Sequence, residues 1–174
     1  EIDAEFFEEL RAYAYSIRNV ESNTLFSIVK ILKVFMKWAY GRYHKTQDYL
    51  TFSVTLHSKE IIYLEYEELL ILFSYPFTGV LCKARDMFCL MSFTGLRVSD
   101  VIRLGPEHFR DGSIWIKTVK GNKEISIPIN RFAAEIITRY KSTLPNMAPQ
   151  KINVYIEKCC ELAGIKKLTS ITSY

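Results

Sequence analysis

The sequence predicts a mainly α-helical protein that contains a single β-hairpin. Along most of its 174 residues, apolar side chains recur three or four positions apart, which is typical of amphipathic helices. Between residues 113 and 129 the apolar period changes to two, which is typical of half-buried strands. Hydrophobic residues make up 49% of the chain and charged residues 24%, so its composition is that of a globular protein and excludes disordered or fibrous classes.

Two amphipathic helices are predicted in the first part of the chain. The first spans about residues 3–16, where Asp3 can cap the amino terminus. The second spans about residues 22–40, with Trp38 expected on its inner face. Apolar periodicity is lost between about residues 42 and 59, and we expect a domain linker near residues 50–59.

The second part is predicted to combine helices with the hairpin. Its helices are expected over residues 66–75, 80–93, 100–104, 131–141 and 150–163. Two strands, 113–118 and 124–129, are joined by a short segment whose Gly121 and Asn122 suit a tight turn. We therefore expect two domains, residues 1–58 and 59–174, of which the second mixes helices with strands.

Basic residues are unevenly distributed, although the net charge of +4 is too small to identify a nucleic-acid partner by itself. Residues 1–58 carry seven basic and seven acidic side chains, whereas residues 110–141 carry seven basic against three acidic. A polyanion would bind the latter region first. Charge alone, however, favours an ordinary solvated face.

Several classes of site are not supported by the sequence. The four cysteines form neither a CxxC pair nor the His/Cys spacing of a zinc site, so we expect buried or inert thiols and no metal. No apolar run approaches the roughly 20 residues that cross a bilayer. The acidic start differs from the basic region of a signal peptide, which makes a cytoplasmic location the default expectation.

The most specific stretch is Thr94-Gly95-Leu96-Arg97, followed by Asp100 three residues after the arginine. It resembles the first arginine box of the tyrosine recombinases, the phage integrase family. The strand pair around Lys120, including Ile127-Pro128 in its second strand, is similar to that family's catalytic-lysine hairpin. Residues 23–39 resemble a helix of the core-binding domain, most closely in the integrases of Bacteroides-type transposons and phages.

The resemblance implies a partial helical core-binding domain in residues 1–58 and an incomplete catalytic domain in residues 59–174. It implies site-specific recombination, as in the integration or excision of a mobile element, with DNA cleaved and rejoined through a 3′-phosphotyrosyl intermediate. Arg97 and Lys120 are then the expected catalytic residues, with Lys123 as the alternative to Lys120. The residues expected to contact DNA are Lys117, Lys123, Arg103, Lys33 and Lys37.

These residue types suit the implied chemistry. A guanidinium stays charged and can hold a phosphate through two hydrogen bonds, as Arg97 would do. A compact ammonium such as that of Lys120 suits a general acid for the leaving 5′ oxygen. Asp100 is expected to brace the start of the helix that follows Arg97.

No cofactor is implied, because the phosphotyrosyl link stores the energy of the broken bond. The expected partner is double-stranded DNA that carries an attachment or recombination site. On this DNA the protein would act as an oligomer. It would be a bacterial or phage-derived protein associated with the nucleoid.

The sequence departs from the family where the second box is expected, after Leu168-Thr169-Ser170. The family has a histidine there and an arginine three residues later, whereas this chain has Ile171 and Tyr174. Isoleucine cannot exchange a proton, and a phenol supplies no cation. We therefore expect a truncated recombinase that lacks the nucleophile and does not cleave DNA alone, since Tyr174 is poorly placed for that role.

Three alternatives stay open. The chain could be a degenerate integrase that binds DNA without cutting it, which the missing second box favours. It could be a helical protein-interaction domain with no DNA role. Type IB topoisomerases share the recombinase chemistry, but the helix that resembles a core-binding domain favours an integrase.

Overall fold

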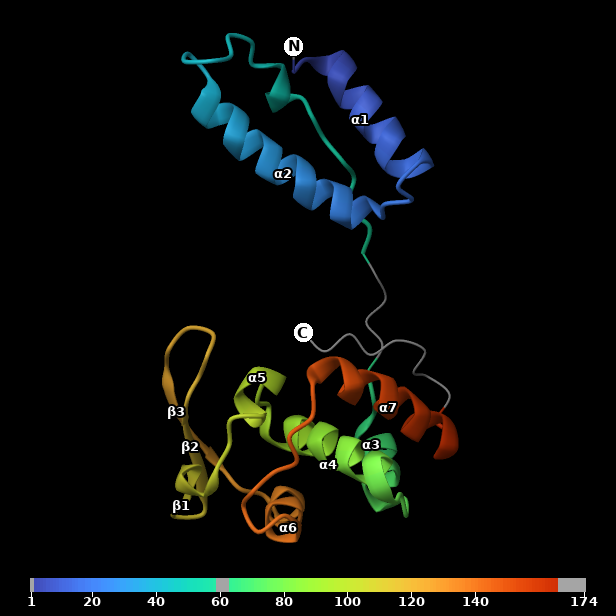
Figure 1. Cartoon of the computed structure of the whole chain (residues 1–174), viewed down its shortest axis with the longest axis vertical. Coiled ribbons are helices and arrows are strands. Elements are labelled where there is room, and N and C mark those ends of the chain that lie inside the picture. Colours follow the sequence, from blue (N-terminus) through green and yellow to red (C-terminus); the bar gives the residue numbers. More distant parts are fainter. Residues whose placement is uncertain (1, 59–62, 166–174) are drawn as a thin grey trace. The chain divides into compact units, whose positions relative to one another are not determined.

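The chain folds into two compact units, Glu1–Glu60 and Ile61–Tyr174, each of which is described by itself. The structure is a computed structural model that describes residues 2–58 and 63–165 (Figure 1). Most of its elements are helices, and the strands form one small antiparallel sheet. The predicted fold class, mainly α with a β-hairpin, is therefore confirmed.

The first unit is built from two helices and a short 3-10 helix. These are α1 (Ala4–Ser16), α2 (Ser22–Ala39) and the 3-10 helix Asp48–Leu50. Asp3 caps α1 as predicted, because its Oδ1 accepts a hydrogen bond from the backbone N–H of Phe6 at 3.0 Å. The core of the unit joins both helices to the segment after them, where the ring of Phe52 stacks on that of Phe7 at 4.6 Å.

Trp38 does not lie on the inner face of α2, so that prediction is wrong. Its side chain is 55% exposed and lies 5.7 Å, between ring centroids, from both Phe35 and Tyr43. Met36 is buried on the core side of α2. Because each helical residue turns by about 100°, Trp38 points to nearly the opposite side of the helix.

The second unit is organised around α4. Its helices are α3 (Tyr66–Ser74), α4 (Gly79–Thr94), α5 (Val98–Val101), α6 (Arg131–Arg139) and α7 (Pro149–Leu162). α4 packs against α3, α6 and α7, so that its side chains form much of the apolar core. α4 thereby joins helices that are far apart in the sequence.

The sheet has the order β1-β2-β3 and is antiparallel throughout. Its strands are β1 (Phe109–Arg110), β2 (Ser113–Lys117) and β3 (Glu124–Pro128), preceded by the 3-10 helix Pro106–His108. β2 and β3 form the predicted hairpin, in which Lys117 pairs with Glu124 next to the turn. The two residues of β1 were not predicted, because so short a strand carries no periodicity.

α5 begins earlier than the predicted helix over residues 100–104. The carbonyl of Arg97 accepts hydrogen bonds from the N–H groups of Asp100 and Val101, at 2.9 and 3.0 Å. The first helical residue is consequently Val98. Asp100 therefore lies within the helix and not at its start.

A buried carboxylate links three helices of the second unit. Asp86 on α4 is fully buried and accepts hydrogen bonds from Arg85, Arg139 and Tyr140 at 2.6 to 2.9 Å. Arg85 also donates to backbone carbonyls at the carboxyl end of α3. Because a buried charge is stable only when it is paired, this network fixes α3, α4 and α6 together.

The cysteines are thiols, as expected. Cys89, Cys159 and Cys160 are buried and Cys82 is partly buried. Burial raises the pKa of Cys159 to about 11 and that of Cys160 to about 12. In the part of the chain that the structure describes, no group of three His, Cys, Asp or Glu side chains could hold a metal ion, and no helix is long and apolar enough to cross a membrane.

Candidate active site

Arg97 is presented by a tight turn at the end of α4. Gly95 ends that helix with a positive φ of 68°, and its N–H donates to the carbonyl of Met91 at 2.8 Å. Thr94 donates to the carbonyl of Leu90 at 2.6 Å, and the side chain of Leu96 is buried beside it. With Thr94 and Leu96 held inward, Arg97 is exposed at the residue that precedes α5.

Lys120 lies in the turn between β2 and β3, which is closed from inside by Thr118. The buried hydroxyl of Thr118 accepts from the N–H of Lys123 at 3.2 Å and lies 3.2 Å from the carbonyl of Lys120. Gly121 and Asn122 provide the positive φ angles of the turn, 93° and 54°. The backbone of the turn is thus fixed, while Lys120 and Lys123 are exposed to solvent.

A hydrogen bond from Val119 to Asp100 connects these two segments. Asp100 is 1% exposed, and its Oδ1 accepts from the backbone N–H of Val119 at 2.8 Å. Val119 directly precedes Lys120, and Asp100 follows Arg97 by three residues. The hairpin is therefore held beside α5, as Figure 1 shows, and the two predicted catalytic residues flank one hydrogen bond.

Asp100 consequently braces the hairpin and not the start of the helix that follows Arg97. Its second oxygen, Oδ2, is buried and has no hydrogen-bond partner within residues 63–165 or 2–58. A buried carboxylate oxygen without a hydrogen bond is unfavourable, so a further hydrogen-bond donor next to Oδ2 would stabilise the site.

Five of the predicted site residues belong to two neighbouring segments, 97–103 and 117–123. All five side chains are exposed, and no ion pair between described residues neutralises any of them. They are Arg97, Arg103, Lys117, Lys120 and Lys123. Arg103 approaches the hairpin directly, because its Nη1 lies 3.5 Å from the carbonyl of Lys117. The result is a surface with several uncompensated cations, which attracts polyanions.

Lys33 and Lys37 lie on α2 in the first unit. The ammonium of Lys33 donates to the carbonyl of Leu50 at 3.0 Å, so it holds the end of the 3-10 helix against α2. Lys37 is exposed in the last turn of α2. The segment Leu168-Thr169-Ser170, Ile171 and Tyr174 lie outside the residues that the structure describes.

Thr118 and Val119 were not predicted as parts of the site. The signal for Thr118 is its register in β2, because Ile114 and Ile116 fill the buried positions of the strand and Thr118 takes the next one. A hydroxyl at a buried strand position requires a local partner, and the turn supplies it. Val119 acts through its backbone, which leaves no signal in the residue type.

Comparison with solved structures identifies the fold. A lambda integrase dimer bound to a COC' core site matches with a TM-score of 0.73 and 17% identity over 94% of this chain and 64% of that one. The XerH recombinase bound to a palindromic difH substrate matches with a TM-score of 0.66 and 14% identity over 97% and 55% of the two chains. The integrase of mycobacterium phage Brujita matches with a TM-score of 0.53 and 16% identity over 94% and 59%.

This chain thus spans between about half and two thirds of the length of these structures. No curated protein matches it. The model of the phage integrase family matches residues 64–171, which contain the arginine turn, α5 and the hairpin and make up more than half of the sequence. The chain therefore belongs to the phage integrase family.

Proposed function

We propose that this chain takes part in site-specific DNA recombination as the portion of a tyrosine recombinase that supplies Arg97 and Lys120. The observation that carries the proposal is the hydrogen bond from Val119 to Asp100, because it ties the segments of both residues together. A scissile phosphate held near this bond could be approached by a guanidinium and by an ammonium. The resemblance of residues 23–39 supports an integrase of the type found in Bacteroides mobile elements.

In the proposed reaction a tyrosyl oxygen bonds to phosphorus while the bond to the 5′ oxygen breaks. Arg97 stabilises the negative charge that grows on the non-bridging oxygens, which a fixed guanidinium does through paired hydrogen bonds. Lys120 gives its proton to the leaving 5′ oxygen. The 3′-phosphotyrosyl link then reacts in reverse with another 5′ hydroxyl, so the strand is rejoined without a cofactor.

Duplex DNA is the proposed partner, contacted by cations of both units. Arg103, Lys117 and Lys123 would bind phosphates beside the reacting one, and Lys33 and Lys37 would do so from α2. Support comes from the solved structures of similar fold, which include a lambda integrase dimer and a tetramer on DNA. Assembly of this chain into an oligomer on DNA is part of the same proposal.

The test compares binding of the full chain and its variants to a DNA duplex over a series of salt concentrations. The logarithm of the binding constant falls as the logarithm of the salt concentration rises. Each of Arg97→Ala and Lys120→Ala should make this negative slope shallower by about one, because each removes about one phosphate contact. The matched control is Lys158→Ala on α7, which removes a charge that is already paired with Glu161 at 2.9 Å. Absence of binding would leave the helical protein-interaction domain as the better interpretation. Binding that is unchanged in both site variants would overturn the assignment of Arg97 and Lys120 to the DNA-binding surface.

A non-catalytic role in DNA binding is the second candidate, and the residues at the second box favour it. Ile171 and Tyr174 stand where the family has histidine and arginine. Incubating the full chain with a nicked duplex and then adding detergent distinguishes the two functions. A covalent protein–DNA adduct that is lost in Arg97→Ala would support cleavage, whereas salt-sensitive binding without an adduct would support the non-catalytic integrase.

A further inference from the structure

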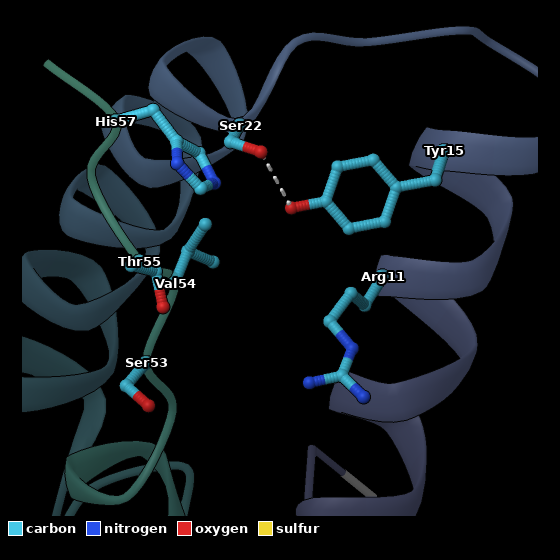
Figure 2. Close-up of a pocket in the computed structure, with 7 residues that line it drawn as sticks. All are labelled: Arg11, Tyr15, Ser22, Ser53, Val54, Thr55 and His57. Carbon is cyan, nitrogen blue, oxygen red and sulfur yellow. Dashed lines mark hydrogen bonds between the residues drawn. The ribbon is translucent and has the colours of Figure 1, made fainter.

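The first unit contains a polar pocket that has no part in the candidate active site. The pocket lies between α1, the first residue of α2 and the extended segment 53–57, and has a volume of about 490 Å³. Figure 2 shows Arg11 and Tyr15 on one wall, with Ser22 and the extended segment facing them. Apart from Val54, every residue that lines it carries a side chain able to donate a hydrogen bond.

Hydrogen bonds hold the walls of the pocket in place. The side chain of Asn23 pairs with the backbone of His57 in both directions, with the amide donating at 2.9 Å and the oxygen accepting at 3.0 Å. The hydroxyls of Tyr15 and Ser22 lie 3.3 Å apart across the top of the pocket (Figure 2). These contacts span residues 15 to 57, so the polar groups are arranged before any ligand binds.

Arg11 determines the sign of charge that the pocket accepts. It is the only Lys, Arg, Asp or Glu among the lining residues, and its guanidinium points into the pocket in Figure 2. Glu8 lies on the preceding turn of α1, and its carboxylate pairs with Nη2 of Arg11 at 2.6 Å. The side chain of Glu8 is 58% exposed. A guanidinium can serve two anions at once, because its five N–H groups form a planar fork.

Ser22, the first residue of α2, places a hydroxyl on the wall opposite Arg11. Thr55, on the extended segment, adds a second hydroxyl to that wall. Donors thus approach the centre from opposite walls, which suits a tetrahedral oxyanion better than a planar carboxylate that a single guanidinium would satisfy.

We propose that this pocket binds a phosphate group, with Arg11 as its charged ligand and the hydroxyls of Tyr15, Ser22 and Thr55 as its neutral ones. The phosphate has two possible sources, which are the backbone of duplex DNA and free inorganic phosphate. The first source rests on the proposed function, whereas the pocket itself does not. Bound DNA would then be held by the first unit at one defined phosphate, in addition to contacts made by exposed lysines.

Inorganic phosphate is the probe for the pocket. Titrated into the isotope-labelled full chain, it should produce saturable NMR shifts in the backbone amides of residues 22, 53, 55 and 57. Arg11→Gln should weaken this binding at least fivefold, and Glu8→Gln should retain or strengthen it because it releases a competing carboxylate. Arg18→Gln, which removes an exposed arginine outside the pocket, is the matched control and should have no effect.

The proposal is overturned if the shifts do not saturate, or if Arg11→Gln binds phosphate as the unmodified chain does. The spectrum of Arg11→Gln without phosphate checks that the first unit is still folded. Duplex binding then identifies the source. A salt slope reduced by about one in Arg11→Gln but not in Arg18→Gln supports a DNA phosphate, whereas unchanged slopes with intact phosphate binding support the free ion.

This result can be separated from the outcome of the proposed function. The phosphate titration contains no DNA and involves neither Arg97 nor Lys120. A chain that fails to bind duplex could therefore still bind phosphate in the pocket, and a chain that binds duplex through Arg97 and Lys120 could still fail the titration.

Discussion

The backbone N–H of Val119 donates a hydrogen bond of 2.8 Å to Oδ1 of the buried carboxylate of Asp100. This bond joins residues that are 19 positions apart and belong to a helix and a turn. Val119 is next to Lys120, and Asp100 lies within one helical turn of Arg97. The bond therefore couples the position of the hairpin to the fold of the arginine turn.

Asp100→Ala should detach the hairpin turn from α5. The substitution leaves the N–H of Val119 without its acceptor, and loss of a buried hydrogen-bond partner costs about 1–3 kcal/mol. Amide exchange at Val119 should accelerate much more than exchange in the centre of α4. Both effects can be measured by hydrogen exchange and by urea unfolding.

The matched control for this prediction is Glu157→Ala, which removes an exposed carboxylate from α7. It should leave the exchange rate of Val119 unchanged and alter stability by less than about 0.5 kcal/mol. If both variants accelerate exchange at Val119 equally, the hydrogen bond does not position the hairpin.

Gly95→Ala should destabilise the arginine turn without any steric clash. A Cβ atom at Gly95 meets nothing within 4 Å, but the φ of 68° is unfavourable for a residue with a side chain. The expected cost is about 1 kcal/mol from backbone conformation alone. Gly95→Asn should cost less, since asparagine tolerates this region better than alanine. Equal losses in the two variants would indicate that side-chain packing, and not φ, determines the residue here.

Much of the fold could be predicted from the sequence because it depends on local periodicity. The predicted boundaries of α4 and α7 differ from the observed ones by one residue at each end. Predictions failed where a single contact decides the outcome. The carbonyl of Arg97 starts α5 at Val98, two residues before the predicted start at Asp100, and the orientation of α2 leaves Trp38 exposed.

The candidate site likewise has parts that the sequence predicts and parts that it does not. Arg97 and Lys120 could be proposed from motifs, because their neighbours in the sequence set the turn and the hairpin. The partner of Asp100 could not, since a backbone N–H leaves no mark on residue type. The pocket of the first unit depends on Asn23 meeting His57, and a separation of 34 residues gives no periodic signal for that contact.

Asp86→Ala should destabilise the second unit strongly. The carboxylate is fully buried and is the shared acceptor of Arg85, Arg139 and Tyr140. Removing one member of a buried charged network leaves its partners uncompensated, which costs about 3–5 kcal/mol. Unfolding in urea measures this loss directly.

Glu135→Ala is the appropriate comparison, because Glu135 also pairs with Arg139 at 2.8 Å but is 57% exposed. Surface pairs contribute little, so this variant should lose less than about 1 kcal/mol. Similar losses in Asp86→Ala and Glu135→Ala would show that the buried network does not stabilise the unit more than a surface pair does.

Stability should fall in alkali because of the buried thiols. Burial raises the pKa of Cys159 to about 11 and that of Cys160 to about 12, from an ordinary value of 9.0. Between pH 9.0 and about 11 the unfolded chain releases these protons while the folded chain retains them, so the free energy of unfolding decreases as the pH rises. The contribution is fully present below pH 9.0 and is lost as the pH rises toward these folded values.

Cys160→Ala isolates one of these protons. Any packing loss from the substitution is the same at all pH values, so the informative quantity is the change in stability between about pH 8 and about pH 10.5. That change should be smaller in Cys160→Ala, because the variant releases roughly one proton fewer on unfolding. Tyr140, whose pKa is also raised by burial and by the neighbouring Asp86, contributes equally to both proteins and cancels. Parallel curves for the two proteins would mean that the Cys160 thiol ionises as readily in the folded chain as in the unfolded one, which its complete burial on α7 argues against.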